Sequence, residues 1–208
     1  MQELRGYETP IGVLPSVTSI LSLTQSEEKR EKLRKWQHKM DKVSGKGAAD
    51  RYSTEARNRG TLIHKLIHLS LMGQAVNTDE FDELLQVKPI LQAIKPIAME
   101  LKVWHQSGYA GTLDCIATYQ DKICLFDWKT SKRIKRRSWI QDYFLQGAAY
   151  AQAWNSLYPD QQANRVVIVV MGQQLQIFDE DLELLLPEWN ERLQEYKKIG
   201  DISLQVVG

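Results

Sequence analysis

The sequence predicts an α/β or α+β protein in which a mixed central sheet is flanked by helices and preceded by a helical N-terminal region. Three features of the chain indicate this class. Apolar residues recur at helical spacing through much of residues 1–95. Three strand-like segments joined by short polar turns come next. Beyond them, helical and strand-like segments alternate as far as residue 198.

The first half of the chain is expected to be mainly helical. One segment is rich in Lys, Arg and Glu and places Leu33, Trp36 and Met40 at helical spacing. A longer apolar pattern ends near residue 72, where Gly73 is typical of a helix C-terminus. Helices are therefore predicted at residues 27–42, 48–72 and 79–94, and a loop at residues 11–18.

The second half is expected to supply the sheet. Strands are predicted at 97–105, 109–119 and 122–130, and the third is apolar on both faces, which is typical of a central strand covered on both sides. Helices at 139–157 and 181–198 and strands at 165–171 and 175–178 complete the predicted order. We expect residues 1–208 to form one domain, with 1–95 as its mainly helical part and 96–208 as the sheet and C-terminal helices.

The composition narrows the class of protein. Hydrophobic residues make up 43% and charged residues 25%, as in soluble globular domains, and no apolar run approaches the roughly 20 residues that cross a bilayer. The formal net charge is +1, so any affinity for nucleic acid must come from local clusters. No secretory core or transit helix is evident at the start. Cys115 and Cys124 lie in apolar runs and are expected to be buried thiols in a reducing, cytoplasm-like compartment.

Two neighbouring strand segments carry the residues most suggestive of chemistry. Asp114 ends the sequence GYAGTLD, and Asp127 and Lys129 belong to LFDWK at the end of the next segment. Side chains at i and i+2 of a strand share a face, so Asp127 and Lys129 should point the same way, and a hairpin would bring Asp114 to them. Two carboxylates and an ammonium suit a divalent cation and a phosphate. The plainer alternative is that Asp127 and Lys129 simply pair.

Three further residues are candidates for the same site. His64 and His68 are four residues apart on one face of a predicted helix, and a neutral imidazole at His64 could add a nitrogen ligand, whereas His68 is better explained as an ordinary helix histidine. Glu100 could be an acid on the metal side, a partner for Lys129 or a solvent-exposed residue.

A polar pair and a basic run follow the LFDWK strand. Gln146 and Tyr150 are four apart on a helix and could hold a phosphate or orient Lys129; a plain polar pair is the alternative. Basic residues followed by aromatic ones suit single-stranded nucleic acid, although such runs are often only a solvated face. The contacts expected from this run are Lys132, Arg133, Lys135, Arg136, Arg137 and Trp139. Residues 29–36 form a weaker basic patch interleaved with Glu.

Taken together, these motifs resemble the PD-(D/E)xK nuclease superfamily in its RecB-like branch. That branch has a helix histidine, a G-x-x-D acid, a D-x-K strand and a Q-x-x-x-Y helix in this order, and the chain carries all four. The sequences PSVTSIL (15–21), GTLIH (60–64) and GYAGTLDC (108–115) are similar to the mitochondrial genome maintenance exonuclease group and its phage and bacterial relatives. The resemblance spans about residues 10–155.

The resemblance implies a restriction-endonuclease-like fold and metal-dependent cleavage of DNA, with a preference for single strands that have a free end. It implies His64, Asp114 and Asp127 as ligands of Mg²⁺ or Mn²⁺, with Asp114, Asp127 and Lys129 as the catalytic set. Gln146 and Tyr150 would support them, and Glu100 is kept as a further supporting acid. Ser16, in the first matching sequence, joins the expected nucleic-acid contacts.

The chain also departs from the family pattern. Two cysteines cannot build the four-cysteine iron–sulfur cluster of several RecB-like relatives, so none is expected. The long N-terminal extension of the mitochondrial members is missing, so we expect a cytoplasmic protein of a bacterium or a phage-infected cell. The alternatives that remain are a structure-selective endonuclease, an enzyme acting on RNA, or a DNA-binding protein without catalytic activity.

Overall fold

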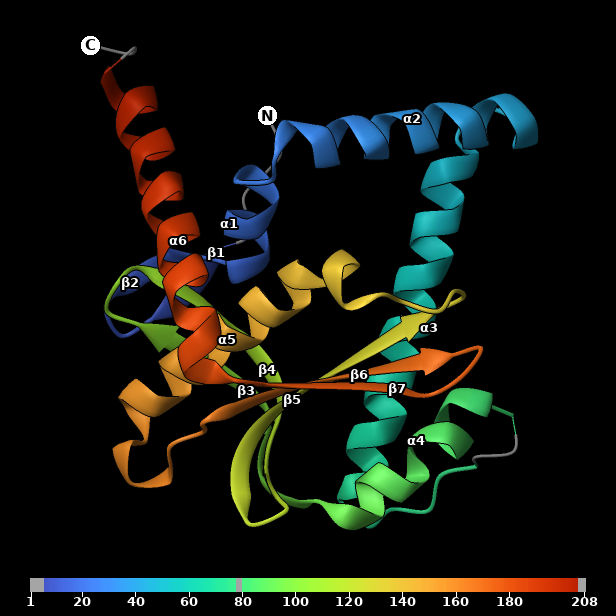
Figure 1. Ribbon diagram of the computed structural model, residues 1–208, viewed down its shortest axis with the longest axis vertical. Helices are drawn as coiled ribbons and strands as arrows, with labels where there is room; N and C mark the ends of the chain where they lie inside the picture. The colour runs from blue at the N-terminus through green and yellow to red at the C-terminus, as the bar shows by residue number, and fades with distance from the viewer. Residues whose placement is uncertain (1–5, 78–79, 206–208) are drawn as a thin grey trace.

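A five-stranded mixed sheet forms the centre of the molecule (Figure 1). The computed structural model describes residues 6–77 and 80–205, with side chains as far as residue 200. The strands are β3 (Lys95–His105), β4 (Tyr109–Tyr119), β5 (Lys122–Ser131), β6 (Arg165–Gly172) and β7 (Gln176–Asp181), in that spatial order. All neighbours are antiparallel except β5 and β6, which are parallel. The predicted mixed sheet is confirmed, and β5 is its central strand.

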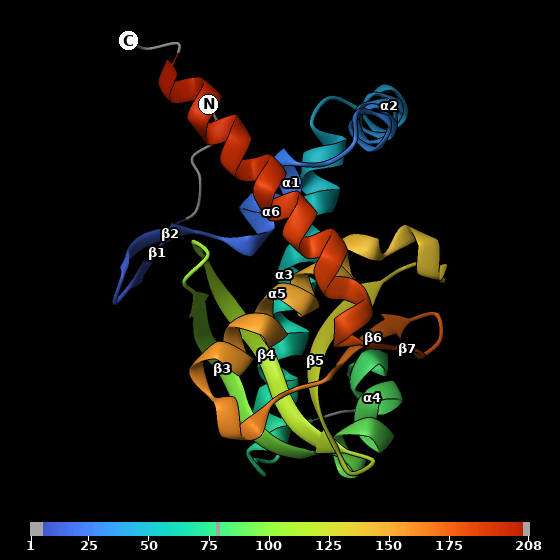
Figure 2. The same cartoon turned by 60° about the vertical axis from the view of Figure 1, so that its left-hand side comes forward.

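Helices cover both faces of this sheet, as Figures 1 and 2 show. On one face, α5 (Gln141–Leu157) and α6 (Leu182–Gln205) pack over an apolar cluster that includes Leu125 of β5. On the other face, α3 (Ala48–Leu71) and α4 (Asp82–Ala93) pack over a second cluster that includes Phe126 and Trp128 of the same strand. Adjacent β5 side chains therefore enter different cores, because successive residues of a strand point to opposite faces.

The N-terminal segment differs from the prediction. Instead of a loop at 11–18, the structure has a hairpin of β1 (Gly6–Thr9) and β2 (Gly12–Pro15), followed by α1 (Val17–Leu23). Gly12, the first residue of β2, follows the two-residue turn with φ of 110°, a conformation that glycine adopts without a steric penalty. Strands of four residues and a helix of seven are too short to produce a clear periodicity, so sequence pattern alone missed them.

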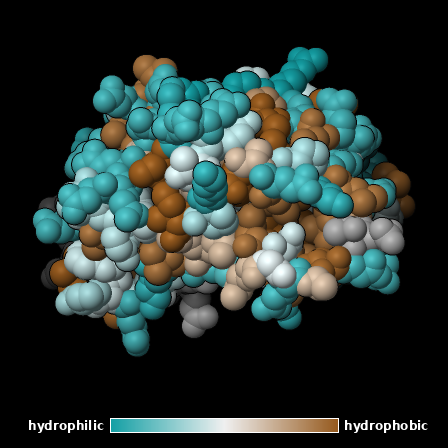
Figure 3. Space-filling model, turned by 90° about the horizontal axis from the view of Figure 1, so that it is seen from below, coloured by the Kyte–Doolittle hydropathy of each residue, from teal (hydrophilic) through white to brown (hydrophobic). Residues whose placement is uncertain are grey.

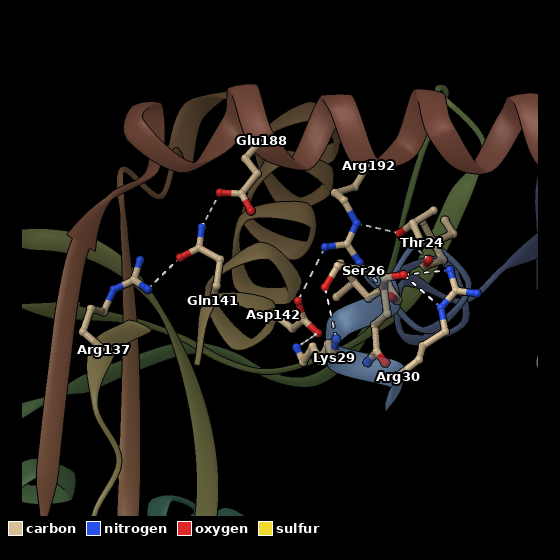
Figure 4. A network of polar contacts seen from close by, with 12 residues as sticks. Thr24, Ser26, Lys29, Arg30, Arg137, Gln141, Asp142, Glu188 and Arg192 are labelled. Atoms are coloured by element: carbon tan, nitrogen blue, oxygen red, sulfur yellow. Dashed lines mark hydrogen bonds and ion pairs between the residues drawn. The ribbon is translucent and has the colours of Figure 1, made fainter. Parts of the chain in front are cut away.

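Helix α2 (Glu27–Ser44) has no buried residue and lies across the end of α3, away from the sheet (Figure 1). Its start is held by a polar network shown in Figure 4, in which Lys29 pairs with Asp142 of α5. In the same network, the Arg192 side chain from α6 donates to Thr24 Oγ1 and to the carbonyl oxygen of Leu21. The far end of α2 turns into α3 through Gly45 and Gly47, which both have positive φ.

None of the helices in the described part of the chain is both long and apolar enough to cross a membrane. Seen from below, the surface carries groups of apolar side chains set among hydrophilic ones (Figure 3). Cys115 and Cys124 are buried and free, as predicted. Short 3-10 turns, η1 (Arg137–Trp139) and η2 (Pro159–Gln161), flank α5.

Candidate active site

The candidate site begins where β4 and β5 separate. Their ladder runs from Tyr119–Lys122 at the hairpin turn to the pair Cys115–Phe126, and the register shows no pair beyond it. At this fork the Oδ2 atom of Asp114 accepts a hydrogen bond of 2.9 Å from the backbone N–H of Trp128. The Asp114 carboxylate thus takes the hydrogen bond that a backbone carbonyl of β4 would accept in a continuous ladder. Because the side chain lies between the two backbones, β4 and β5 stay apart at the site.

A second carboxylate faces Asp114 from the other neighbouring strand. The register pairs Met99 with Cys115 and Leu101 with Leu113, which sets Glu100 across from Asp114. Glu100 has φ of 47°, a left-handed conformation that is uncommon for a residue with a side chain. Glu100 is exposed at the edge of the cluster, and partial desolvation of its carboxyl together with the nearby Asp114 carboxylate raises the pKa of Glu100. Like charges placed opposite each other across two strands are destabilising, so this arrangement favours a cation between them.

His64 completes this cluster from α3. The Ile63 and Ile67 side chains anchor the helix in the core against the sheet, and the His64 ring lies over the fork. Its Nε2 atom is 2.6 Å from the carbonyl oxygen of Trp128, and its Nδ1 atom is 3.4 Å from Asp114 Oδ1. Burial alone would lower the pKa of His64, but the Asp114 carboxylate outweighs it and raises the pKa. With both nitrogens facing oxygen atoms, the metal-free ring is suited to carry two protons.

These residues form a donor set that suits a hard divalent cation. His64, Glu100 and Asp114 each offer one ligand atom, and the three atoms lie within 4.8 Å of one another. Carboxylate oxygens with one imidazole nitrogen are ligands that Mg²⁺ and Mn²⁺ accept. In the part of the chain that the structure describes, this group does not include Asp127.

Asp127 is engaged instead with Lys129. Asp127 is 2% exposed, and the Lys129 Nζ atom lies 2.8 Å from its Oδ1 and 2.7 Å from its Oδ2. Burial raises the pKa of Asp127 to about 6, although the ammonium group opposes this shift. Burial would lower the pKa of Lys129, but the Asp127 and Asp114 carboxylates prevail and raise it. Lys129 is therefore a protonated cation at neutral pH.

Gln146 and Tyr150 of α5 continue the chain of contacts from Lys129. The Lys129 ammonium lies 3.4 Å from Gln146 Oε1, and Gln146 Nε2 donates to the Tyr150 hydroxyl at 3.2 Å. Tyr150 in turn packs against Gly111 of β4, where a Cβ atom would lie 2.4 Å from its ring. Both residues thus lie where they could orient Lys129, which was one of the roles considered for them.

A cleft of about 670 Å³ opens beside this cluster. Its α3 wall includes residues that the sequence reasoning did not select. Arg57, Thr61 and Lys65 line it together with His64 and His68. Their spacing of three, four or seven residues places them along one side of α3, and this pattern could have identified them once His64 was taken as a site residue.

The expected nucleic-acid contacts have different environments in the structure. Ser16 is 2% exposed, and its hydroxyl caps α1 by accepting from the Ser19 backbone N–H at 3.0 Å, so it is not available on the surface. Arg137 pairs with Glu180 of β7 and lies over the Phe144 ring. Both residues therefore have structural roles.

Other residues of the basic run are accessible. Trp139 is 59% exposed, with the Arg136 guanidinium 5.2 Å from its ring centre. Lys132 and Lys135 line a second cavity of about 730 Å³, where the Lys132 ammonium lies over the Tyr52 ring. Arg133 is exposed. The basic residues of α2, by contrast, pair largely with glutamates of the same helix.

Comparison with known proteins gives a consistent set of relatives, although no family model matches the chain. It is 31% identical over 202 residues to mitochondrial genome maintenance exonuclease 1 of Homo sapiens, which covers 88% of this chain and 58% of that protein. The Xenopus tropicalis protein of the same name is 33% identical over 205 residues, covering 90% and 58%. The chain thus spans little more than half the length of these relatives.

A bacterial protein also matches. An ATP-dependent helicase/nuclease component of Streptococcus sanguinis (strain SK36) is 32% identical over 123 residues, covering 57% of this chain and 10% of that protein. These similarities confirm the resemblance that the motifs indicated.

Proposed function

We propose that this chain, a homologue of mitochondrial genome maintenance exonuclease 1, is a metal-dependent DNA exonuclease that prefers single strands with a free end. The observation that carries the proposal is the group of ligand atoms from His64, Glu100 and Asp114 within 4.8 Å of one another, beside the partly buried ammonium of Lys129. A metal site next to a fixed cation is suited to a phosphodiester, whose negative charge increases on the oxygens during hydrolysis.

The residues that would hold the metal are His64, Glu100 and Asp114, with Asp127 close by as the further ligand that the resemblance implies. Bound there, Mg²⁺ or Mn²⁺ would supply a water of lowered pKa at neutral pH and stabilise charge on the departing oxygen. The paired acids explain why a cation is needed: without one, Glu100 and Asp114 face each other as like charges across two strands.

Lys129 supplies the second part of the proposed chemistry. Its ammonium is protonated and kept in place by Asp127 and Gln146, so it needs little reorganisation when a phosphate arrives. In this position it would orient the attacking water and stabilise the charge on the phosphate oxygens. Asp127 thereby acts in part through Lys129, because its carboxylate holds the ammonium on the side of the site.

The preference for single strands rests on the exposed residues after β5. Trp139 offers a ring for base stacking, and Lys132, Lys135 and Arg136 offer positive charge within a few residues of it. Their aromatic and basic character suits an unpaired strand, whose bases are free to stack.

A time course on end-labelled single-stranded, duplex and circular single-stranded DNA, with Mg²⁺ and with Mn²⁺, tests the proposal. We expect stepwise shortening of the linear single strand and no loss of the circle. Cutting of the circle would instead indicate an endonuclease. Retardation of DNA in a gel without released nucleotides would indicate a protein that only binds DNA. Parallel digestion of a matched RNA oligomer tests whether the sugar is distinguished.

A further inference from the structure

One side of α3 carries positive charge that no other part of the described structure neutralises. Arg57 and Lys65 are exposed, line the cleft beside His64 and Glu100, and have no ion pair or side-chain hydrogen bond with any described residue. Other basic side chains nearby do have partners: Arg59 of the same helix binds Glu83 at 2.6 Å, and Arg34 of α2 binds Glu27 and Glu31.

The opposite wall of the cleft is acidic. Glu100 lines it directly, and Asp114 belongs to the same cluster of ligand atoms. A polyanion that approaches the metal cluster must overcome the repulsion of these carboxylates, which Lys129 balances only in part. Unpaired basic residues on the facing wall supply the missing attraction, because charges that share a cleft act on each other more strongly than charges across open water.

The positions along α3 match an extended ligand. Arg57 lies seven residues, about two turns, before His64, and Lys65 directly follows it. From Arg57 to Lys65 the helix rises about 12 Å, whereas one strand of B-DNA carries a phosphate for every roughly 3.4 Å of duplex axis, so the two side chains can contact different phosphates of one strand. Thr61, between them on the same cleft wall, adds a hydroxyl that can donate to a phosphate oxygen.

We propose that Arg57 and Lys65 bind the phosphates of the substrate strand and hold it along α3, so that one phosphodiester lies over the metal cluster. This inference rests on the proposed function and names a substrate-binding surface for it. Among the described residues, the basic run after β5 does not line this cleft: its Lys132 and Lys135 line the second cavity, together with other residues of α3. The strand passes between Arg57 and Lys65 on one wall and Glu100 on the other. Their contribution is to binding and position, because the hydrolytic groups are on the strands.

The test measures binding and turnover separately in Arg57→Gln, Lys65→Gln and a control, Lys88→Gln. Lys88 is an exposed lysine of α4 that lines neither cavity, so its loss changes net charge by the same amount. Binding is followed by fluorescence anisotropy of a labelled single-stranded oligonucleotide in EDTA, from about 0.05 to 0.5 M salt. Each phosphate contact on a single strand adds about 0.7 to the steepness with which log affinity falls against log salt concentration, here called the salt slope. Over the tenfold range from about 0.1 to 1 M salt, this amounts to about a fivefold difference in affinity.

We expect each cleft variant to bind about fivefold more weakly at 0.1 M salt, to lower the slope by about 0.7, and to raise KM more than it lowers kcat. Lys88→Gln should match the wild type. Unchanged affinity and slope in both cleft variants, or an equal loss in Lys88→Gln, would overturn the inference while leaving the proposed nuclease intact. If the wild type itself neither bound nor cut DNA, the proposed function would fail first.

Discussion

Replacing Gly111 with Ala should displace the Tyr150 ring and, through it, the contacts that orient Lys129. A Cβ atom at position 111 would lie 2.4 Å from Tyr150 Cε1 and 2.8 Å from its hydroxyl oxygen, well inside contact distance. Tyr150 is 5% exposed, so its ring cannot swing into solvent. Because Tyr150 accepts from Gln146, and Gln146 Oε1 lies 3.4 Å from the Lys129 ammonium, a displaced ring would shift the group that orients Lys129.

Overpacking of this kind in a well-packed core costs about 1–3 kcal/mol of stability. Urea unfolding followed by tryptophan fluorescence measures it, and nuclease turnover of the same protein measures the effect on Lys129. For the stability measurement Gly60→Ala is a suitable control, because Gly60 lies within α3 and its added Cβ would be 3.6 Å from Thr130, an ordinary contact. Alanine favours a helix, so this control should be stabilised by up to about 1 kcal/mol.

A second background isolates the clash. Leucine at position 150 lacks the ring and hydroxyl atoms that approach Gly111, so Gly111→Ala in the Tyr150→Leu protein should cost less than about 0.5 kcal/mol. If the penalty were the same in both backgrounds, or absent in the wild type, the contact between Gly111 and Tyr150 would not be the reason for glycine at this position.

Further predictions concern the cluster itself. Lys129→Ala should retain metal binding by calorimetry while turnover drops about 10²–10³-fold, as when one transition-state donor is removed; normal DNA degradation by this variant would refute its assigned role. Asp114→Asn should weaken Mn²⁺ binding, measured by the same titration, because the ligand loses its charge; unchanged affinity would place the metal elsewhere. The pKa of His64 is raised by Asp114, so in metal-free protein it adds stability that is full below about pH 6.5 and lost as the pH rises through the higher folded value. The difference in Tm between wild type and His64→Gln, both without metal, should therefore shrink from about pH 6 to 8. The increase in Tm that Mn²⁺ causes in the wild type should grow over the same range, because fewer protons then compete with the metal for the His64 ring. Parallel curves of Tm against pH for the two metal-free proteins would contradict this assignment.

The elements with strong local patterns could be predicted from the sequence. The long helices α2 to α5 and the strands β3, β4 and β5 lie within a few residues of their expected positions, whereas α6 begins as expected and continues seven residues beyond the predicted end at residue 198. Apolar residues on both faces also identified β5 as a central strand, and in the structure both of its faces meet a core. The β1–β2 hairpin and α1 were missed since each is short and depends on packing against the rest of the fold for its stability.

The candidate site, like the fold, could be predicted from the sequence only in part. The spacing of Asp127 and Lys129 on one strand predicted that they share a face, and they are in contact. Whether Asp127 holds a metal or the lysine is a matter of side-chain geometry, and the structure shows it against Lys129. For Glu100 the sequence left a metal-side acid and a solvent-exposed residue open, and the structure shows an exposed residue that also lies across from Asp114, a position set by the register between β3 and β4.

The sequence alone established which strands contain charged residues and that Asp127 and Lys129 lie on the same face of one strand. It could do so because the periodicity of a strand or a helix depends only on residues close together in the chain. The tertiary structure decided which of those charges meet. The register that sets Glu100 against Asp114 and the packing that lays His64 over the strand fork both depend on contacts between segments far apart in the chain. Such contacts follow from how the two cores are filled, and no local pattern encodes them.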